Sequence, residues 1–156
     1  MQINEQGLKR SVLIRIGGEV DRASASLIII GDDLDPDEVT KILKCEPSDA
    51  IRKGEKGRNN RPARTGRWSL DSPLEEACLD EQIRWLLDAL PEDQAIWEYL
   101  WERYELVVFC GLFMDDWNRE TILLSTTLAG MGRRGLRLDL DIYADSPTEE
   151  EPPESE

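Results

Sequence analysis

A strict alternation near the end of the chain, 136-LRLDLDIY-143, constrains the fold more than any other feature of the sequence. Successive side chains of a β-strand point to opposite faces, so the four aliphatic side chains share one face and the charged and polar ones share the other. A strand with one apolar and one polar face belongs to an antiparallel or mixed sheet that is covered on one side only. The sequence therefore predicts two layers, a sheet and the helices that cover one of its faces.

The first half of the chain supplies a strand and a helix in quick succession. The run 24-SASLIIIG-31 is rich in β-branched residues and predicts a strand buried on both faces. In 35-DPDEVTKILK-44, Asp35 is placed to cap a helix, Pro36 suits its first position, and Glu38 completes a capping box. We therefore assign the acids of this segment to helix initiation rather than to catalysis.

The second half continues the alternation of strands and helices. The remaining elements expected are a strand at 66–70, a helical region from 73 to 103 that Pro91 interrupts, a strand at 104–114, an apolar run at 121–124 that pairs back as a hairpin, and a helix from the cap Ser125 to Arg133. The order predicts an α+β, two-layer fold with a ferredoxin-like split βαβ core, an antiparallel or mixed sheet and an enlarged helical insertion.

Length and composition set the domain boundaries around these elements. A chain of 156 residues fits a single domain, which we place at residues 24–144. Residues 1–23 form an N-terminal extension with a candidate extra strand, SVLIRI, at 11–16. Residues 145–156 carry six acids and three prolines, so we expect a disordered acidic tail.

One segment departs from the charge of the rest. Residues 52–67 contain seven Lys or Arg and one acid, a charge of +6, in a chain whose formal net charge is −14. The other 140 residues therefore carry 12 bases and 32 acids, or −20. Such a surface repels nucleic acid and anionic lipid, although a Debye length of about 8 Å lets a local basic patch act by itself.

Protein binding is the function that we predict for this basic loop. Arg and Trp are residue types that anchor protein interfaces, and a basic loop on an acidic body can be steered onto a complementary partner. The predicted binding residues are Arg52, Lys53, Lys56, Arg58, Arg61, Arg64, Arg67 and, on a polar turn, Trp117. The alternative is anion binding, of a nucleotide or RNA, in which Trp68 would stack on a base.

Two simpler interpretations of the loop remain open beside these. It could be a flexible, solvated connection between strands. It could also attract the chain's own acidic tail, although contacts between exposed charges are each worth only about 0 to 1 kcal/mol. In that case the tail would shield the loop through its high local concentration.

Catalysis is not indicated by the sequence. The chain has no histidine, which excludes His-dependent nucleophiles, His acid–base catalysis and most catalytic zinc sites. Asp139 and Asp141 share a strand face, yet alternation already explains them. Cys78 and Cys110 are expected in the core, and Cys45 lies near a helix C-terminus, which disfavours a thiolate. We therefore predict a protein that is not an enzyme and that needs no cofactor or metal.

Location follows from the absence of targeting signals. There is no run of about 18 apolar residues, and MQINEQGLKR lacks the order of a signal peptide. The three cysteines suggest neither a disulfide framework nor a zinc site. The expectation is a cytoplasmic protein with no membrane partner.

A series of segments between residues 24 and 143 resembles a known bacterial family. These segments are LIIIGDDLDPDEVTKIL, EPSDAIRKGEK, TGRWSL, RWLLDAL and STTLAGMGRRGLRLDLDIY. In this order and at these spacings they resemble the family called domain of unknown function 4279. The resemblance implies a small, stand-alone, intracellular bacterial domain without an assigned activity, in which the basic loop belongs to the family pattern.

Overall fold

The computed structural model describes residues 17–144, which form five strands and four helices. Their bounds are β1 (Arg22–Gly31), α1 (Pro36–Leu43), β2 (Asp49–Ile51), β3 (Gly66–Asp71), α2 (Leu79–Asp88), α3 (Gln94–Trp101), β4 (Glu105–Met114), α4 (Ser125–Arg133) and β5 (Arg137–Ala144). The candidate strand at 11–16 and the acidic tail lie outside the described residues. The domain begins slightly earlier than predicted, because β1 starts at Arg22.

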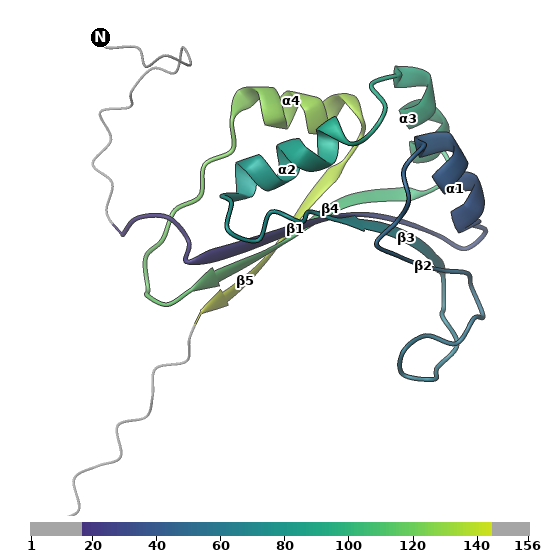
Figure 1. Cartoon of the computed structure of the whole chain (residues 1–156), viewed down its shortest axis with the longest axis horizontal. Helices are drawn as coiled ribbons and strands as arrows, with labels where there is room; N and C mark the ends of the chain where they lie inside the picture. The colour runs from purple at the N-terminus through teal and green to yellow at the C-terminus, as the bar shows by residue number, and fades with distance from the viewer. Residues whose placement is uncertain (1–16, 145–156) are drawn as a thin grey trace, which may run out of the picture.

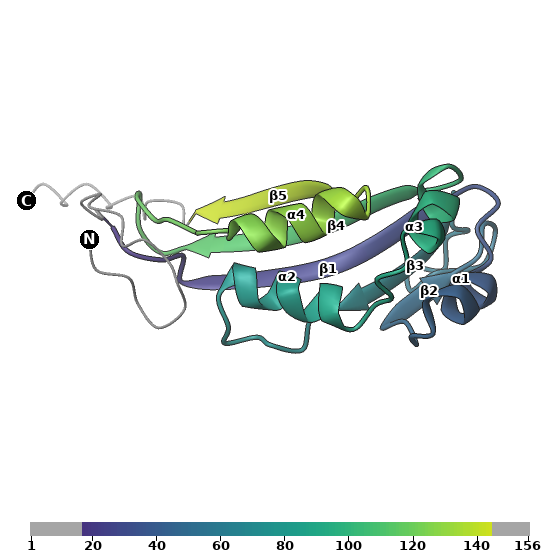
Figure 2. The same cartoon turned by 90° about the horizontal axis from the view of Figure 1, so that it is seen from above.

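The strands form one mixed sheet in the order β2-β3-β1-β4-β5. The first four strands pair antiparallel, and β5 adds parallel to β4. All four helices lie on one face of this sheet (Figure 1, Figure 2). The two-layer α+β prediction is thus confirmed, and the order β4-β1-β3-β2 is that of a ferredoxin-like split βαβ core to which α4 and β5 are added.

The core lies between the helices and the inner face of the sheet. Trp68 of β3 and Trp97 of α3 are fully buried there, with their indole N–H groups donating to Thr40 Oγ1 and to the Pro91 carbonyl. In β1 only alternate side chains are buried, from Ala23 to Ile29. The prediction that this strand is buried on both faces was wrong, because all the helices described between residues 17 and 144 cover the inner face of the sheet. We call the outer face of the sheet the open face.

The helical insertion consists of α2 and α3, which together occupy the position of the second helix in the split core. The break between them falls at residues 89–93, as Pro91 predicted. The start is later than predicted, because residues 73–78 form turns and α2 begins at Leu79. Cys78 therefore precedes the helix and is exposed, which corrects its assignment to the core.

The connection between β4 and α4 differs from the predicted hairpin. Residues 121–124 form no strand, and the pairing nearby is an isolated bridge between Glu19 and Glu120. Ser125 is the first residue of α4 rather than its cap, and the backbone N–H of Leu124 donates to Asp80 Oδ1 at 2.8 Å. Asp80 of α2 thus holds the residue that precedes α4, and the N-cap residue Leu124 makes no side-chain capping hydrogen bond. At α1, the carboxylate of Glu38, which the sequence assigned to a capping box, accepts a hydrogen bond from the Tyr99 hydroxyl at 2.8 Å.

The alternation of β5 gives the correct faces but not the correct burial. Leu138 packs against the core, whereas Leu140 and Ile142 are 46% and 59% exposed. The helix layer leaves this outermost strand partly uncovered, so only part of its apolar face is buried in the core. None of the helices between residues 17 and 144 is both long and apolar enough to cross a membrane.

Candidate binding site at the basic loop

The basic loop, residues 52–67, leaves the sheet at β2 and returns to it in β3. Its two arms are joined by hydrogen bonds from Gly54 N–H to the Ala63 carbonyl and from Ala63 N–H to the Glu55 carbonyl, both 2.8 Å. A turn closes the far end, where the N–H of Gly57 donates to the Arg61 carbonyl at 3.1 Å. The loop therefore has a defined hairpin-like conformation, on the side of the sheet opposite the helices (Figure 1).

The base of the loop is attached to the start of α1 through Arg52. Its guanidinium lies 2.9 Å from Asp35 Oδ1 and 2.6 Å from Asp37 Oδ2, and it also approaches Glu55 at 3.6 Å. The carboxylates of Asp37 and Asp35 raise the pKa of Arg52. The predicted N-cap is present, since Asp35 accepts from the N–H of Asp37 at 3.0 Å, and the same carboxylate also holds the loop.

Two further cations of the loop are paired. The ammonium of Lys53 lies 3.4 Å from Asp32, which directly follows β1. Arg67 is already part of β3 and pairs with Asp49 on the neighbouring β2. Arg52, Lys53 and Arg67 thus pair with carboxylates at the base of the loop, and their role in binding a partner stays a prediction.

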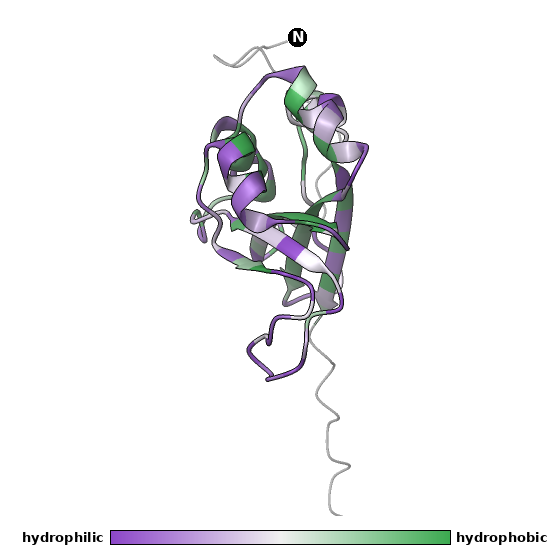
Figure 3. Cartoon of the chain, turned by 90° about the vertical axis from the view of Figure 1, so that its right-hand side faces the viewer, coloured by the Kyte–Doolittle hydropathy of each residue, from purple (hydrophilic) through white to green (hydrophobic). Residues whose placement is uncertain are grey.

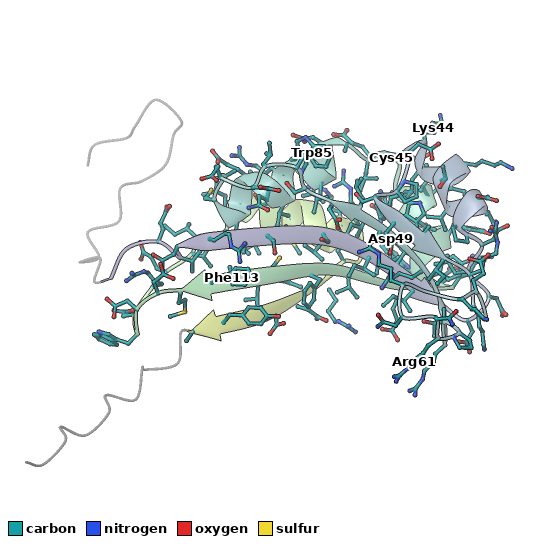
Figure 4. All side chains as sticks on the ribbon, turned by 60° about the horizontal axis from the view of Figure 1, so that its bottom comes forward. Lys44, Cys45, Asp49, Arg61, Trp85 and Phe113 are labelled. Carbon is teal, nitrogen blue, oxygen red and sulfur yellow. The ribbon has the colours of Figure 1, made fainter. Side chains whose placement is uncertain are left out.

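The other four cations lie at the loop tip, which we define as residues 56–64. Lys56, Arg58, Arg61 and Arg64 are exposed, and none of them forms an ion pair with any residue between 17 and 144. The tip is hydrophilic along its length (Figure 3). Arg61 projects from it on the open-face side, away from the helices (Figure 4).

A groove of about 680 Å³ lies between the loop and the open face. We call it the loop groove. It is lined by Ser26 and Ile28 of β1, Asp49, Ala50 and Ile51 of β2, Arg67, Ser69 and Asp71 of β3, and Glu55, Lys56, Gly57, Arg58, Asn59 and Arg61 of the loop. Its size is in the usual range for binding sites.

The walls of the loop groove differ in chemistry. The loop contributes three cations, Lys56, Arg58 and Arg61, that have no ion-pair partner in the described part of the chain, while β1 and β2 contribute the aliphatic side chains of Ile28 and Ile51. Asp71 faces the groove from β3 and accepts a hydrogen bond from Ser26 Oγ at 2.7 Å. An extended chain with acidic and apolar side chains would find complementary groups along this groove.

Trp117 lies far from the loop. It follows β4 and is 84% exposed, so it packs little against the rest of the domain. In the sheet, β4 ends beside Arg22, whereas β3 begins beside Gly31. Nine residues of β1 separate these two ends, or about 30 Å at 3.3 Å per residue. The sequence grouped Trp117 with the basic loop, and the structure places them at opposite ends of the sheet.

The other side chains considered for catalysis are hydrogen-bonded to neighbouring residues or have a raised pKa. Asp139 accepts two hydrogen bonds from Arg137, at 2.8 and 3.0 Å, and Asp141 accepts one from Tyr143. Burial raises the pKa of the Cys110 thiol to about 12. Burial and Glu46 also raise the pKa of Cys45. Between residues 17 and 144 there is no cluster of three or more side chains suited to a metal ion.

The open-face half of the site was missed at the sequence level, although a signal for it existed. In 67-RWSLD-71 the polar Arg67, Ser69 and Asp71 alternate with Trp68 and Leu70, which predicts a strand with one solvated face. β2 gave no comparable signal, because a strand of three residues is too short to show a period.

Comparison with protein families assigns the chain to the group suggested by its sequence. The family model described as domain of unknown function (DUF4279) matches residues 21–145. The chain belongs to the DUF4279 family. The match begins one residue before β1 and ends one residue after β5, so it covers the whole sheet and the basic loop of this DUF4279 domain.

Two further comparisons add no relative to this assignment. A search of curated proteins and a search of solved structures each returned no match. The function of this DUF4279 domain is therefore inferred from its own geometry.

Proposed function

We propose that this domain is a non-enzymatic interaction module whose loop tip and loop groove bind an acidic, extended segment of a partner protein. The observation that carries the proposal is a set of four cations, Lys56, Arg58, Arg61 and Arg64, which form no ion pair within residues 17–144 and are held on a folded hairpin beside a groove. Three other cations fix that hairpin to the domain, so the tip is presented in a defined position before binding. Preorganisation of this kind lowers the entropic cost of association.

The lining of the groove favours a peptide over a nucleic acid. Recognition of single-stranded nucleic acid depends on exposed aromatic side chains that stack on bases. None of the residues that line the loop groove is aromatic, and Trp68 is fully buried with its indole N–H donating to Thr40. Binding of a nucleotide or RNA at the same loop is the alternative function.

The residue types of the domain also favour a binding protein over an enzyme and a reducing compartment over an oxidising one. A module without histidine, whose carboxylates Asp139 and Asp141 are engaged within their own strand, lacks the usual groups for acid–base chemistry. Its three free cysteines, Cys45, Cys78 and Cys110, suit a reducing compartment such as the bacterial cytoplasm. We therefore propose a cytoplasmic, bacterial binding protein rather than an enzyme.

The test is a charge reversal of the loop tip, Arg58→Glu with Arg61→Glu and Arg64→Glu. The matched control reverses three exposed cations on or beside helices, Lys41→Glu, Lys44→Glu and Arg133→Glu, and so changes the net charge equally. Tagged full-length proteins are used to capture partners from the source cells at low salt, and proteins and nucleic acids are both identified. Direct binding of synthetic acidic peptides and of oligonucleotides is measured in parallel.

We expect a stoichiometric protein partner that is retained by the control, lost in the tip variant and weakened by salt. The folded state of the tip variant should match that of the wild type, because its three arginines make no ion pairs within residues 17–144. A partner that binds both variants equally would remove the loop from the mechanism. Recovery of RNA or nucleotide, lost in the tip variant, would replace the proposal with the alternative.

A further inference from the structure

The outer strand β5 has no neighbour on one side. Its eight residues, Arg137–Ala144, pair with β4 alone among residues 17–144, so the backbone groups along its other side are not used by any described strand. An exposed strand edge of this length is a template for pairing with another chain. Natural sheets usually shield such edges with charges on both faces, bulges, prolines or a very short strand. By contrast β5 is eight residues long, contains no proline and is charged on one face only.

An apolar patch lies on the helix side of this edge. Leu140 and Ile142 are 46% and 59% exposed, and Leu128 of α4 is 48% exposed. Gly130 of α4 faces α2, since a Cβ there would lie 2.9 Å from Leu87 Cδ1. At 100° per residue, Leu128 projects about 160° away from Gly130, on the side of the helix that looks toward β5. Three aliphatic side chains thus flank an unused strand edge. We call them the β5 edge patch.

We propose that the β5 edge pairs antiparallel with β5 of a second copy of this chain, so that two five-stranded sheets join about a two-fold axis. The site is separate from the loop groove, which lies beyond β4 and β1 at the other edge of the sheet. The inference therefore does not depend on the proposed function of the loop.

The sequence of β5 is complementary to itself in antiparallel registers centred on Asp139 or on Leu138, and we propose the register centred on Asp139. With Asp139 at the axis, Arg137 lies opposite Asp141 of the second copy, and this pair occurs twice. On the helix side, Leu138 lies opposite Leu140 of the second copy, and Ile142 comes beside Leu136. Opposite charges and aliphatic pairs directly across from each other are the contacts that stabilise a sheet. A two-fold axis repeats each of these contacts, as an isologous interface requires.

In this register the negative charges of the two Asp139 side chains at the axis are partly neutralised by Arg137 of the same strand. Asp139 would face its own copy, but each Asp139 is held by two hydrogen bonds from Arg137 of the same strand. A shift that places Leu140 at the axis instead would bring Asp139 opposite Asp141 twice, with no cation directly across from either. Charge therefore disfavours the register centred on Leu140. The register centred on Leu138 also pairs opposite charges, Arg137 with Asp139, but it places Arg134 rather than an aliphatic residue opposite Ile142. The aliphatic pairs therefore favour the register centred on Asp139, and its self-complementarity favours a second copy as the partner.

The dimer and the loop complex should respond to salt in opposite ways. Each chain has a formal net charge of −14, so two copies repel each other at low ionic strength. Added salt screens this repulsion and should strengthen the dimer. Binding of an acidic segment by the loop tip should weaken under the same change, because that contact is an attraction between opposite charges.

Measurement of the molar mass of the full-length chain tests the inference. Light scattering after size exclusion and sedimentation velocity are run from low to high micromolar concentration, in low and in physiological salt. We expect a concentration-dependent dimer for the wild type that becomes more stable with salt. Leu140→Lys with Ile142→Lys should raise the dimer Kd about 100-fold or more. The control, Leu74→Lys with Ile122→Lys, places the same two changes on other exposed aliphatic residues and should leave the Kd unchanged.

The register is tested by cross-linking in a Cys45→Ser, Cys78→Ser background, which removes the more accessible thiols. Asp139→Cys should form an intermolecular disulfide on mild oxidation, since residues directly across an antiparallel pair are close enough for one. Leu138→Cys should not, and a cross-link there in place of position 139 would overturn the register. A monomer at every concentration and salt would overturn the dimer itself. A monomer in which the β5 amides that face away from β4 exchange slowly would do the same, by showing that another part of the chain covers the edge.

Discussion

Arg52 and Arg58 lie six positions apart in one loop, carry the same side chain, and have opposite surroundings. Arg52 is held by three carboxylates at the base of the loop, two of them from the start of α1. Arg58 belongs to the loop tip, where no residue between 17 and 144 pairs with it. The net charge of a segment is therefore a poor guide to the charge it offers to a partner. Part of it fixes the loop, and the remainder is left to bind.

The base and the tip also differ in how tightly the backbone is packed. At Gly66, where the loop enters β3, a Cβ would lie 2.7 Å from the Leu34 carbonyl oxygen and 3.0 Å from that of Gly31. At Gly57, in the tip, the nearest atom to a Cβ would be Ile51 Cδ1 at 3.6 Å, an ordinary contact. The base is thus a structural junction, whereas the tip has room for change.

The largest expected effect comes from adding a methyl group at these two glycines. Gly66→Ala should lower the free energy of unfolding by about 1 to 3 kcal/mol, because the two carbonyls it meets belong to the backbone and cannot move aside easily. Gly57→Ala should change it by less than about 0.5 kcal/mol. Chemical denaturation at neutral pH measures both. Equal effects at the two positions would break the distinction between base and tip.

A smaller effect is expected from truncating the two arginines. Arg52→Ala should lower the melting temperature, since it leaves the carboxylates of Asp35 and Asp37 near each other without their shared cation. Arg58→Ala should leave the melting temperature unchanged and should weaken binding of an acidic peptide. Thermal unfolding and a peptide titration on the same two variants give the comparison. If Arg58→Ala melts lower than Arg52→Ala, the tip has a structural role that contradicts our assignment.

The smallest effect is a difference in acid sensitivity. The N–H of Asp37 and the guanidinium of Arg52 lower the pKa of Asp35 below its ordinary value of 3.8. A carboxyl whose pKa is lower in the folded state stabilises the fold above the unfolded pKa, and this contribution is lost as the pH falls below 3.8 and through the lowered pKa of the folded state. Asp35→Asn keeps a capping side chain but removes this titration.

We therefore expect Asp35→Asn to be less stable than the wild type at pH 7 and to lose less stability between pH 5 and pH 3. Urea unfolding at several pH values in this range measures how steeply the free energy of unfolding falls with pH. Some slope should remain, because the N–H of Asp115 and the side chain of Arg119 also lower the pKa of Asp21. Arg58→Ala is the control and should retain the wild-type slope. If Asp35→Asn leaves the pH dependence of the free energy of unfolding unchanged, the acid sensitivity does not arise at the base of the loop.

Local signals predicted most of the fold. The β-branched run of β1, the cap at Asp35 and the alternation of β5 each specify an element through its own residues, and these elements appear where expected. What the sequence could not show was which faces a second element covers. β1 looked fully buried because its outer face contains aliphatic residues, such as Ile28 and Ile30. Coverage is decided by the placement of helices encoded far away in the chain.

The candidate site was predictable only in part for the same reason. The seven cations of the loop were evident, but the pairing of Arg52 and Lys53 depends on Asp32, Asp35 and Asp37, which precede Arg52 by 15 to 20 positions. Asp35 and Asp37 were already explained as helix-start acids. The loop groove depends on three strands that meet only in the folded sheet. Cys78 was misplaced because the apolar pattern of α2 extends one turn beyond the point where the helix begins.

The central position of β1 has a consequence for the synthesis of the chain. Leu27 lies opposite Val108, so the second neighbour of β1 is encoded 81 positions later. At about 5 to 20 residues per second on the ribosome, β1 waits about 4 to 16 s before β4 can pair with it. Until then an apolar strand has one side unpaired in the nascent chain. Translation speed and chaperone supply, more than the stability of the finished sheet, should therefore set the yield of folded protein.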